Sequence, residues 1–171
     1  MMKLRSLVEK DAIPMLEWMH DPAVNHVFRA DFASMTRDRA LLFIQGGARA
    51  ATERHYAICD DADEYMGTIS LKHIDEANGT AEYAIVLRRA AQGQGYAGFA
   101  TREILRIAFG ELGLHKVYLN VLKENEHASG FYEHMGFRYE GTQREQLLLG
   151  GRRQDLKWYG ILAGEWQAMK A

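Results

Sequence analysis

Three glycines that lie close together, Gly93, Gly95 and Gly98, lead directly into a helical pattern of apolar residues. The first backbone N–H groups of a helix have no partner within it, so a glycine-rich turn at that point can bind an anion. The apolar positions recur at helical spacing as far as Leu112, and Gly113 supplies a C-terminal stop. We therefore predict that residues 92–98 form a cradle for a pyrophosphate group.

The composition limits what kind of protein carries this cradle. The chain has 171 residues, of which 47% are hydrophobic and 26% charged, and this predicts one globular domain over residues 1–171. A formal net charge of -2 gives no general electrostatic reason to bind nucleic acid or an anionic membrane. We find no apolar run of the roughly 18 residues that a membrane span needs, and no apolar signal-peptide core, so we expect a cytoplasmic protein. Cys59 is the single cysteine, which excludes a disulfide within the chain.

The elements before the cradle begin with a short strand over residues 3–8 and a helix with Asp11 as its N-cap. Residues 23–35 mix aromatic and charged side chains without a clear period, which indicates a pocket wall or a lid. A second helix is expected from Ser34 or Thr36 to residues 46–47. Its buried side is predicted to consist of Leu41, Leu42 and Ile44.

The middle of the chain changes to a period of two, which is typical of strands. Residues 54–60, 65–74 and 80–88 read as three strands of an antiparallel meander that leads into the cradle. After the cradle and its helix we expect a strand, a helix and a closing strand pair that turns at Gly150 and Gly151; the predicted bounds are 116–122, 126–135, 137–149 and 152–162. The fold class is therefore α/β, of the α+β type.

Two other phosphate-binding motifs fit this pattern poorly. The glycines match G-x-G-x-x-G, but a dinucleotide-binding fold places that motif after its first strand, with an acidic residue about 20 positions later. Here the loop follows a meander, and no acid lies between Leu114 and Lys116. A Walker-type loop needs Gly-Lys-Ser/Thr after the glycines, which is absent. A glycine-rich turn without a ligand is the remaining alternative.

Two blocks of the chain resemble the GNAT superfamily of N-acetyltransferases. Residues 92–97, QGQGYA, match its Q/R-x-x-G-x-G/A pattern, and residues 125–137 are similar to its N-x-x-A-x-x-x-Y-E-x-x-G-F segment. The ending GRRQDLKWYGILAGEW is similar to the last strands of the subgroup that includes the ribosomal-protein N-terminal acetyltransferases. The resemblance implies a mixed, mostly antiparallel sheet of about seven strands flanked by about four helices, splayed in the middle to hold acetyl-CoA.

The resemblance also implies how coenzyme A is held. The N–H groups of the cradle bind the pyrophosphate, and the strand end at residues 85–87 diverges from the strand 116–122, so that its backbone pairs with the pantetheine arm and places an N–H on the thioester oxygen. Asn125 has an amide for the arm, or alternatively acts as a helix N-cap. The implied cofactor contacts are Ile85, Val86, Leu87, Gln92, Gly93, Gln94, Gly95, Tyr96, Ala97, Gly98, Asn125 and Ser129.

Tyr132 occupies the position of the general acid in the matched segment. Attack of an amine on a thioester expels a thiolate, and a phenol with a pKa near 10 can protonate it. The alternative is a packing role beside Phe131 and Met135, and some family members work without this tyrosine.

The acceptor amine must lose a proton before it attacks, because an alkylammonium group has a pKa near 10. Glu82 is the carboxylate that we expect to act as base, directly or through water. The alternation along residues 80–86 fits equally well with Glu82 on a solvated face. Other candidates are histidines, none of them in a spacing typical of a metal site, so we expect no metal: His20, His26, His73, His127 and His134.

The acceptor pocket is expected between residues 18–35 and the closing strand pair. The expected wall residues are Trp18, His26, Phe28, Arg29, Asp31 and Phe32 on one side, and Arg144, Glu145, Arg152, Arg153 and Asp155 on the other. A polyamine would call for clustered carboxylates, whereas arginines and aromatics suit a nucleotide-linked amino sugar or an anionic small amine. The mixture favours a small-metabolite amine, such as an amino sugar or a polyamine, over a protein N-terminus, without choosing one. The function predicted is an acetyl-CoA-dependent N-acetyltransferase, with a non-catalytic acyl-CoA-binding module as the rival; a homodimer is compatible with both.

Overall fold

A seven-stranded mixed sheet forms the centre of the computed structural model, which describes residues 1–171. The strand order is β1-β2-β3-β4-β5-β7-β6, and every neighbouring pair is antiparallel except β4 with β5. The sheet confirms the predicted meander and the predicted fold class. The strands are β1 (Lys3–Ser6), β2 (Arg54–Cys59), β3 (Tyr65–Asp75), β4 (Thr80–Leu87), β5 (Lys116–Leu122), β6 (Arg138–Leu149) and β7 (Arg152–Leu162).

Six α-helices accompany the sheet, two more than expected. The two additional ones are the short α2 and the C-terminal α6. A π-helical turn over Ile107–Glu111 extends α4, and Gly113, just after its C-cap Leu112, has a φ of 64°. The helices are α1 (Ala12–Met19), α2 (Pro22–Asn25), α3 (Arg37–Gly47), α4 (Tyr96–Arg106), α5 (Glu126–His134) and α6 (Ala163–Lys170).

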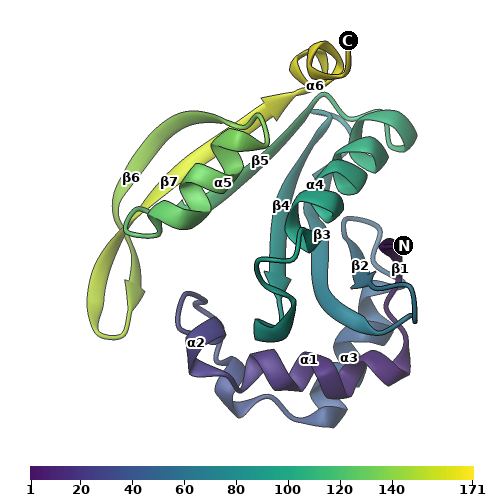
Figure 1. Cartoon of the computed structure of the whole chain (residues 1–171). Coiled ribbons are helices and arrows are strands. Elements are labelled where there is room, and N and C mark those ends of the chain that lie inside the picture. Colours follow the sequence, from purple (N-terminus) through teal and green to yellow (C-terminus); the bar gives the residue numbers. More distant parts are fainter.

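The helices cover the two faces of the sheet and bury a separate core on each (Figure 1). On one face, α4, α5 and α6 pack against strands β2 to β7 around Ile104, Leu119 and Trp166. On the other face, α1, α2 and α3 pack around a second core, which includes Met15, Trp18 and Ala40. The segment 18–35, which the sequence predicts as a wall of the acceptor pocket, packs against this second core.

Two details of the first helices differ from the prediction. The buried side of α3 consists of Ala40 and Ile44, whereas Leu42 is 67% exposed. Asp11 lies at the N-cap position of α1, but its carboxylate does not cap that helix. Instead it accepts hydrogen bonds from the Val8 N–H, at 2.9 Å, and from the Arg5 guanidinium.

The Arg5–Asp11 pair fixes β1 to α1. Two guanidinium nitrogens of Arg5 lie 2.7 and 2.9 Å from the Asp11 carboxylate, whose side chain is 1% exposed. Breaking a buried ion pair leaves an uncompensated charge, so we expect Asp11→Ala to lower the free energy of unfolding by about 3 kcal/mol. Urea unfolding measures this change. Asp61→Ala is the control, because that carboxylate is 80% exposed; a loss there equal to the loss at Asp11 would contradict the assignment.

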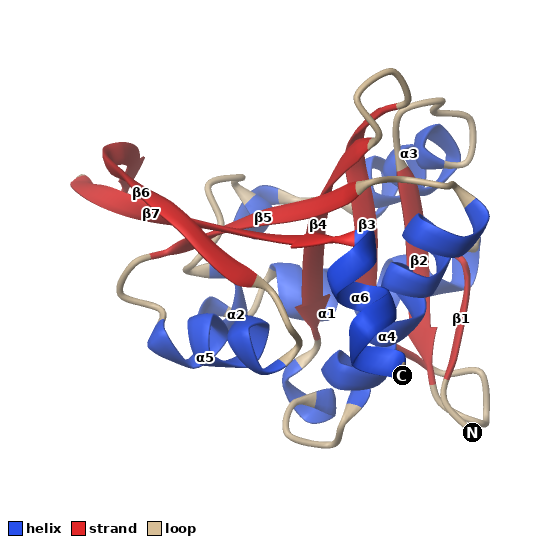
Figure 2. Ribbon diagram, turned by 90° about the horizontal axis from the view of Figure 1, so that it is seen from above, coloured by secondary structure: helices blue, strands red, loops and turns tan.

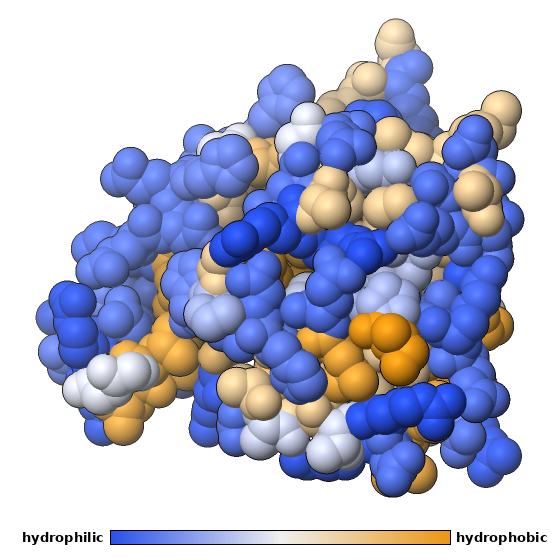
Figure 3. Space-filling view, turned by 60° about the horizontal axis from the view of Figure 1, so that its bottom comes forward, coloured by the Kyte–Doolittle hydropathy of each residue, from blue (hydrophilic) through white to orange (hydrophobic).

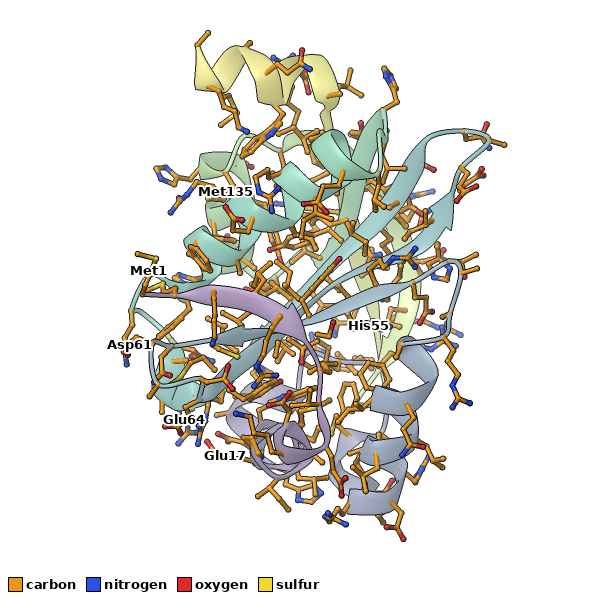
Figure 4. The ribbon with its side chains drawn as sticks, turned by 90° about the vertical axis from the view of Figure 1, so that its right-hand side faces the viewer. Met1, Glu17, His55, Asp61, Glu64 and Met135 are labelled. Carbon is orange, nitrogen blue, oxygen red and sulfur yellow. The ribbon has the colours of Figure 1, made fainter.

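Arg88 connects the end of β4 to α1. Its Nε donates to Glu17 at 3.0 Å, and its Nη1 lies 2.8 Å from Glu64. Figure 4 shows Glu17 and Glu64 on the same side of the molecule, below β1. The arginine directly precedes the turn that leads into the glycine loop, so these contacts hold the loop in place relative to the sheet.

The face that carries α1, α2 and α3 is largely hydrophilic (Figure 3). Its hydrophobic side chains form small separate patches, because the apolar sides of these helices face the sheet. None of the helices combines the length and the apolar character needed to cross a membrane.

Candidate functional site

A cleft opens in the sheet because the two central strands pair over only part of their length. β4 and β5 run parallel and pair only where Thr80–Glu82 lie opposite Lys116–Tyr118. Beyond this point β5 stays with β7, while β4 stays with β3 as far as Leu87 (Figure 2). The strands diverge as the resemblance implies, and the backbone groups of the β4 end that face β5 have no strand partner.

The glycine loop follows the end of β4 and turns sharply into α4. Gly93 and Gly95 have φ values of 72° and 88°, a conformation that favours glycine, and Gly95 is the N-cap of α4. No backbone N–H from Gly93 to Gly98 donates to a protein acceptor; the first such donor in the helix is Phe99, which bonds to the Gly95 carbonyl. These free donors at a helix N-terminus form an anion cradle, as the glycines predict.

The surroundings of the loop leave the cradle open. A Cβ added at Gly93 would meet nothing within 4 Å. The Gln94 side chain turns back to the Ala90 carbonyl, at 2.5 Å, and the Tyr96 ring is buried in the core, so both residues present only their backbone to a ligand. The Arg102 guanidinium approaches within 3.5 Å of a Cβ built at Gly98. Arg102 is a positive group beside the cradle that the sequence reasoning missed, and the i, i+4 spacing from Gly98 was its only signal.

Two adjoining cavities occupy the cleft. The first, of about 550 Å³, extends from α2 past Ile85, Val86 and Leu87 to Gln92. The second, of about 600 Å³, extends between β4, β5 and α5 to the segment after α2. They share five lining residues, so together they form one continuous path from the glycine loop into the molecule: Val27, Phe28, Ile85, Leu122 and Asn125.

Tyr132 projects from α5 and lines the second cavity. Its ring is held by aromatic neighbours, with centroids of Tyr83, Phe131 and Phe137 at 5.7, 5.5 and 6.0 Å. Burial raises the pKa of Tyr132 to about 12, so the phenol keeps its proton at neutral pH. The packing role and the proton-donor role that the sequence left open are thus compatible in one side chain.

Glu82 lines the same cavity, and its side chain is 15% exposed, so it does not lie on a fully solvated face. Its Oε1 accepts a hydrogen bond from the Asn120 amide at 3.0 Å, and its Oε2 lies 3.3 Å from His73 Nε2. The sequence reasoning did not select Asn120. Its position on β5, two residues beyond the partner of Glu82 in the β4–β5 pairing, is the structural reason for the contact.

His73 reaches Glu82 from a bulge in β3. The register between β3 and β4 shifts between Lys72 and Asp75, and His73 has a φ of 48°, a conformation that is uncommon outside glycine. Such local strain is frequent at functional sites. The imidazole is 69% exposed, so it connects the half-buried carboxylate to solvent.

Asn125 and Ser129, the two predicted cofactor contacts on α5, lie in different environments. Asn125 lines both cavities, and its Oδ1 also caps the helix by accepting from the Ala128 N–H at 3.2 Å. Ser129 is 5% exposed and lines neither cavity. Its hydroxyl is buried without a hydrogen-bond partner in the protein, so its contact with the cofactor stays a prediction of the resemblance.

The predicted acceptor wall on residues 18–35 is only partly correct. Phe28, Arg29 and Phe32 line the second cavity, and His26 lines the first. Trp18 lines neither of these two cavities; it is 4% exposed, and its indole N–H donates to the Tyr65 hydroxyl at 3.0 Å. Asp31 caps the turn at Ser34, with its carboxylate 3.3 Å from the N–H.

The predicted wall on the β6–β7 pair needs a larger correction. Leu147 and Leu156 line the second cavity from this side. The charged residues that the sequence favoured do not line either cavity, and Asp155 is bound to the Glu145 N–H at 2.8 Å and to Lys123. These residues are Arg144, Glu145, Arg152, Arg153 and Asp155. Irregular pairing at Gly141 and between Gln143 and Leu147 changes which side chains face inward.

The remaining histidines do not converge on one point. His127 lines the first cavity, and His20 contacts the Met35 carbonyl at 2.8 Å. The chain holds no group of three or more histidine, cysteine, aspartate or glutamate side chains placed to bind a metal ion.

Comparison with known proteins gives the same family that the two sequence blocks resemble. Residues 2–138 match the family model described as an acetyltransferase (GNAT) domain. The chain is 34% identical over 114 residues to spermidine N(1)-acetyltransferase of Vibrio cholerae, and 34% identical over 104 residues to the putative ribosomal N-acetyltransferase YdaF of Bacillus subtilis. These matches span 67% and 61% of this chain but only 66% and 57% of the two relatives.

A solved structure matches over almost the whole chain. The crystal structure of spermidine N-acetyltransferase from Vibrio cholerae in complex with CoA and spermine superposes with a TM-score of 0.89 at 27% identity. The match covers 97% of this chain and 98% of that one.

Proposed function

The chain belongs to the GNAT acetyltransferase family, and on that premise we propose that residues 1–171 act as one acetyl-CoA-dependent N-acetyltransferase domain for the primary amine of a small molecule. The observation that carries this proposal is the combination of two features: free N–H groups from Gly93 to Gly98, and diverging strands that leave the β5-facing backbone groups at the end of β4 without a strand partner. Solved relatives named spermidine N-acetyltransferases support a small-molecule acceptor.

The residues of the cleft fit coenzyme A. The N–H groups from Gly93 to Gly98 and the nearby Arg102 would hold the pyrophosphate. The β5-facing backbone groups along residues 85–87 and the Asn125 amide would hold the amide-rich arm. When bound, acetyl-CoA supplies an acetyl thioester that an amine can attack directly.

Two side chains on opposite walls of the second cavity would handle the protons. Glu82 would take the proton that the acceptor ammonium must lose, and His73 would pass it on to solvent. Tyr132 would donate its proton to the departing thiolate. An N–H at the diverging end of β4 would bind the thioester oxygen as negative charge develops on it.

We expect Glu82→Gln to lower kcat/KM at pH 7 by about a hundredfold, which is the lower end of the usual effect of general-base loss. The loss should shrink as the pH rises toward about 10, because more of the amine is then deprotonated in solution. A pH profile of both enzymes measures this. Glu76→Gln, in the exposed turn before β4, is the control. If kcat/KM of Glu82→Gln is lower by the same factor at every pH, Glu82 does not act as the base.

A screen of amines tests the proposed function as a whole. Polyamines, amino sugars, amino acids, antibiotics and peptides are supplied with acetyl-CoA, and thiol release is compared with acetylated product. We expect equal amounts of the two products for at least one small amine. Turnover of peptides alone would indicate a protein N-terminal acetyltransferase. Binding of acetyl-CoA without any turnover would indicate a non-catalytic acyl-CoA-binding module.

A further inference from the structure

Two of the three charged residues that line the second cavity are cations without an ion pair in the protein. Lys72, on β3, is half-buried, and Arg29, on the segment after α2, is exposed; both line the cavity. Neither takes part in an ion pair or a side-chain hydrogen bond of the protein. The third charged residue of this wall, Glu82, is already bound to Asn120 and close to His73. The cavity therefore has a surplus of positive charge.

The carboxylates near the cavity cannot offset this surplus. Asp21 caps α2 through the Ala23 N–H and pairs with Arg89 at 3.2 Å. Asp31 and Asp155 are bound to backbone N–H groups, at 3.3 and 2.8 Å. Glu124 lines only the first cavity, which coenzyme A would occupy. A molecule with several ammonium groups would thus be repelled by Lys72 and Arg29. The only carboxylate in the second cavity to bind it would be Glu82, which already contacts Asn120 and His73.

An apolar recess of about 230 Å³ adjoins the second cavity on the α1 and α3 side. Lys72, Phe28 and Phe32 line both spaces, so the lysine stands where they meet. Further inside, the recess is lined mainly by apolar side chains, among them Met15, Trp18, Met19 and Met35.

The polar groups that reach this recess already have partners inside the protein. The Thr68 hydroxyl bonds to the Tyr65 hydroxyl at 2.7 Å, and the Ser70 hydroxyl bonds to His55 at 2.7 Å. The second nitrogen of His55 is held by Glu53 at 2.8 Å, and the ring lies between the sheet and α3 (Figure 4). What the recess offers a ligand is therefore apolar surface.

We propose that the acceptor is an amine that also carries a carboxylate or phosphate group, which Lys72 and Arg29 bind, together with an apolar portion that enters the recess. This inference rests on the proposed function, because it specifies the acceptor of the same site. Lys72 and Glu82 are direct partners across β3 and β4, so their Cβ atoms are only about 5 Å apart. The amine at Glu82 and the anion at Lys72 therefore belong to neighbouring parts of one molecule, and polyamines are disfavoured.

Matched pairs of amines test the charge requirement. The pairs are L-phenylalanine with its carboxamide and 1-amino-2-phenylethylphosphonate with phenethylamine, all of which carry an apolar ring; spermidine is the polycation. For the wild type we expect the anionic member of at least one pair to have a kcat/KM at least about tenfold higher than its neutral partner. We expect the same advantage over spermidine, because a hydrogen bond to a charged group contributes at least a factor of about ten. Lys72→Glu should abolish this preference and improve spermidine, whereas the affinity for acetyl-CoA stays unchanged.

Lys157→Glu is the control, because Lys157 is also half-buried and unpaired but lines neither cavity. A wild type that prefers spermidine, with no change in selectivity in Lys72→Glu, would overturn the inference and leave the proposed function standing. Absence of turnover with every amine would count against the proposed function instead. In that case, the anionic amines are titrated into the CoA-loaded wild type and the CoA-loaded Lys72→Glu variant. Equal binding to both proteins would overturn the inference.

Discussion

Replacing Tyr132 by phenylalanine is expected to lower kcat by about 10²- to 10⁴-fold while the affinity for acetyl-CoA stays the same. Tyr132 lines the second cavity, and its ring is held by Tyr83, Phe131 and Phe137, so removing one oxygen leaves the packing intact. Because burial raises the pKa of Tyr132 to about 12, its deprotonation should not lower the wild-type rate below about pH 11. Steady-state kinetics and calorimetric titration measure the two effects.

Tyr139→Phe provides a matched control for this experiment. Tyr139 is 54% exposed on β6, and its hydroxyl bonds to Thr142 at 2.7 Å, away from the cleft. We expect its kcat to equal that of the wild type. Unchanged kcat in Tyr132→Phe would show that the phenol is a packing residue and that the thiolate receives its proton from water or from another group.

Replacing Gly98 by glutamate is expected to weaken acetyl-CoA binding by about a hundredfold or more, since like charges about 4 Å apart repel strongly near a protein surface. Gly98 lies in the first turn of α4, and its added Cβ would have only an ordinary contact, 3.5 Å from Arg102. Helix propensity and the helix dipole both favour glutamate over glycine at this position. The thermal midpoint of the variant should therefore equal or exceed that of the wild type.

Gly98→Ala separates the effect of charge from that of volume. Alanine adds the same Cβ without a carboxylate, so we expect it to retain most of the affinity. An equal loss of affinity in both variants would show that close backbone approach matters at Gly98 and that charge does not. Full affinity in Gly98→Glu would mean that the pyrophosphate lies elsewhere.

Local patterns were sufficient to predict the elements that hold the cofactor. The strand 116–122 has the predicted bounds, and the glycines at 93 and 95 do adopt the positive φ values that a tight turn before a helix requires. These features depend on residues close together in sequence, and the two matched blocks added the pairing between β4 and β5 that no periodicity shows. The short α2 was missed because four residues carry no helical period.

The acceptor side of the site was less predictable, because it depends on which side chains of each strand and helix face the cavity. Asn125, Ala128 and Tyr132 face the second cavity, whereas Ser129, between the last two in sequence, faces the core. On β6 the irregular pairing places Leu147 at the cavity in place of the charged residues nearby. Lys72 and Asn120 could not be predicted as site residues, because they lie near Glu82 only through the pairing of β4 with β3 and β5.

Calorimetric titration of the wild-type protein with acetyl-CoA, compared with S-acetylpantetheine, tests the central claim most directly. The two ligands share the thioester and the arm, but only acetyl-CoA carries the pyrophosphate that the N–H groups from Gly93 to Gly98 would bind. We predict one acetyl-CoA site per chain and binding of S-acetylpantetheine that is weaker by about a hundredfold or more. No binding of acetyl-CoA, or equal binding of the two ligands, would contradict the assignment of the glycine loop as its pyrophosphate site.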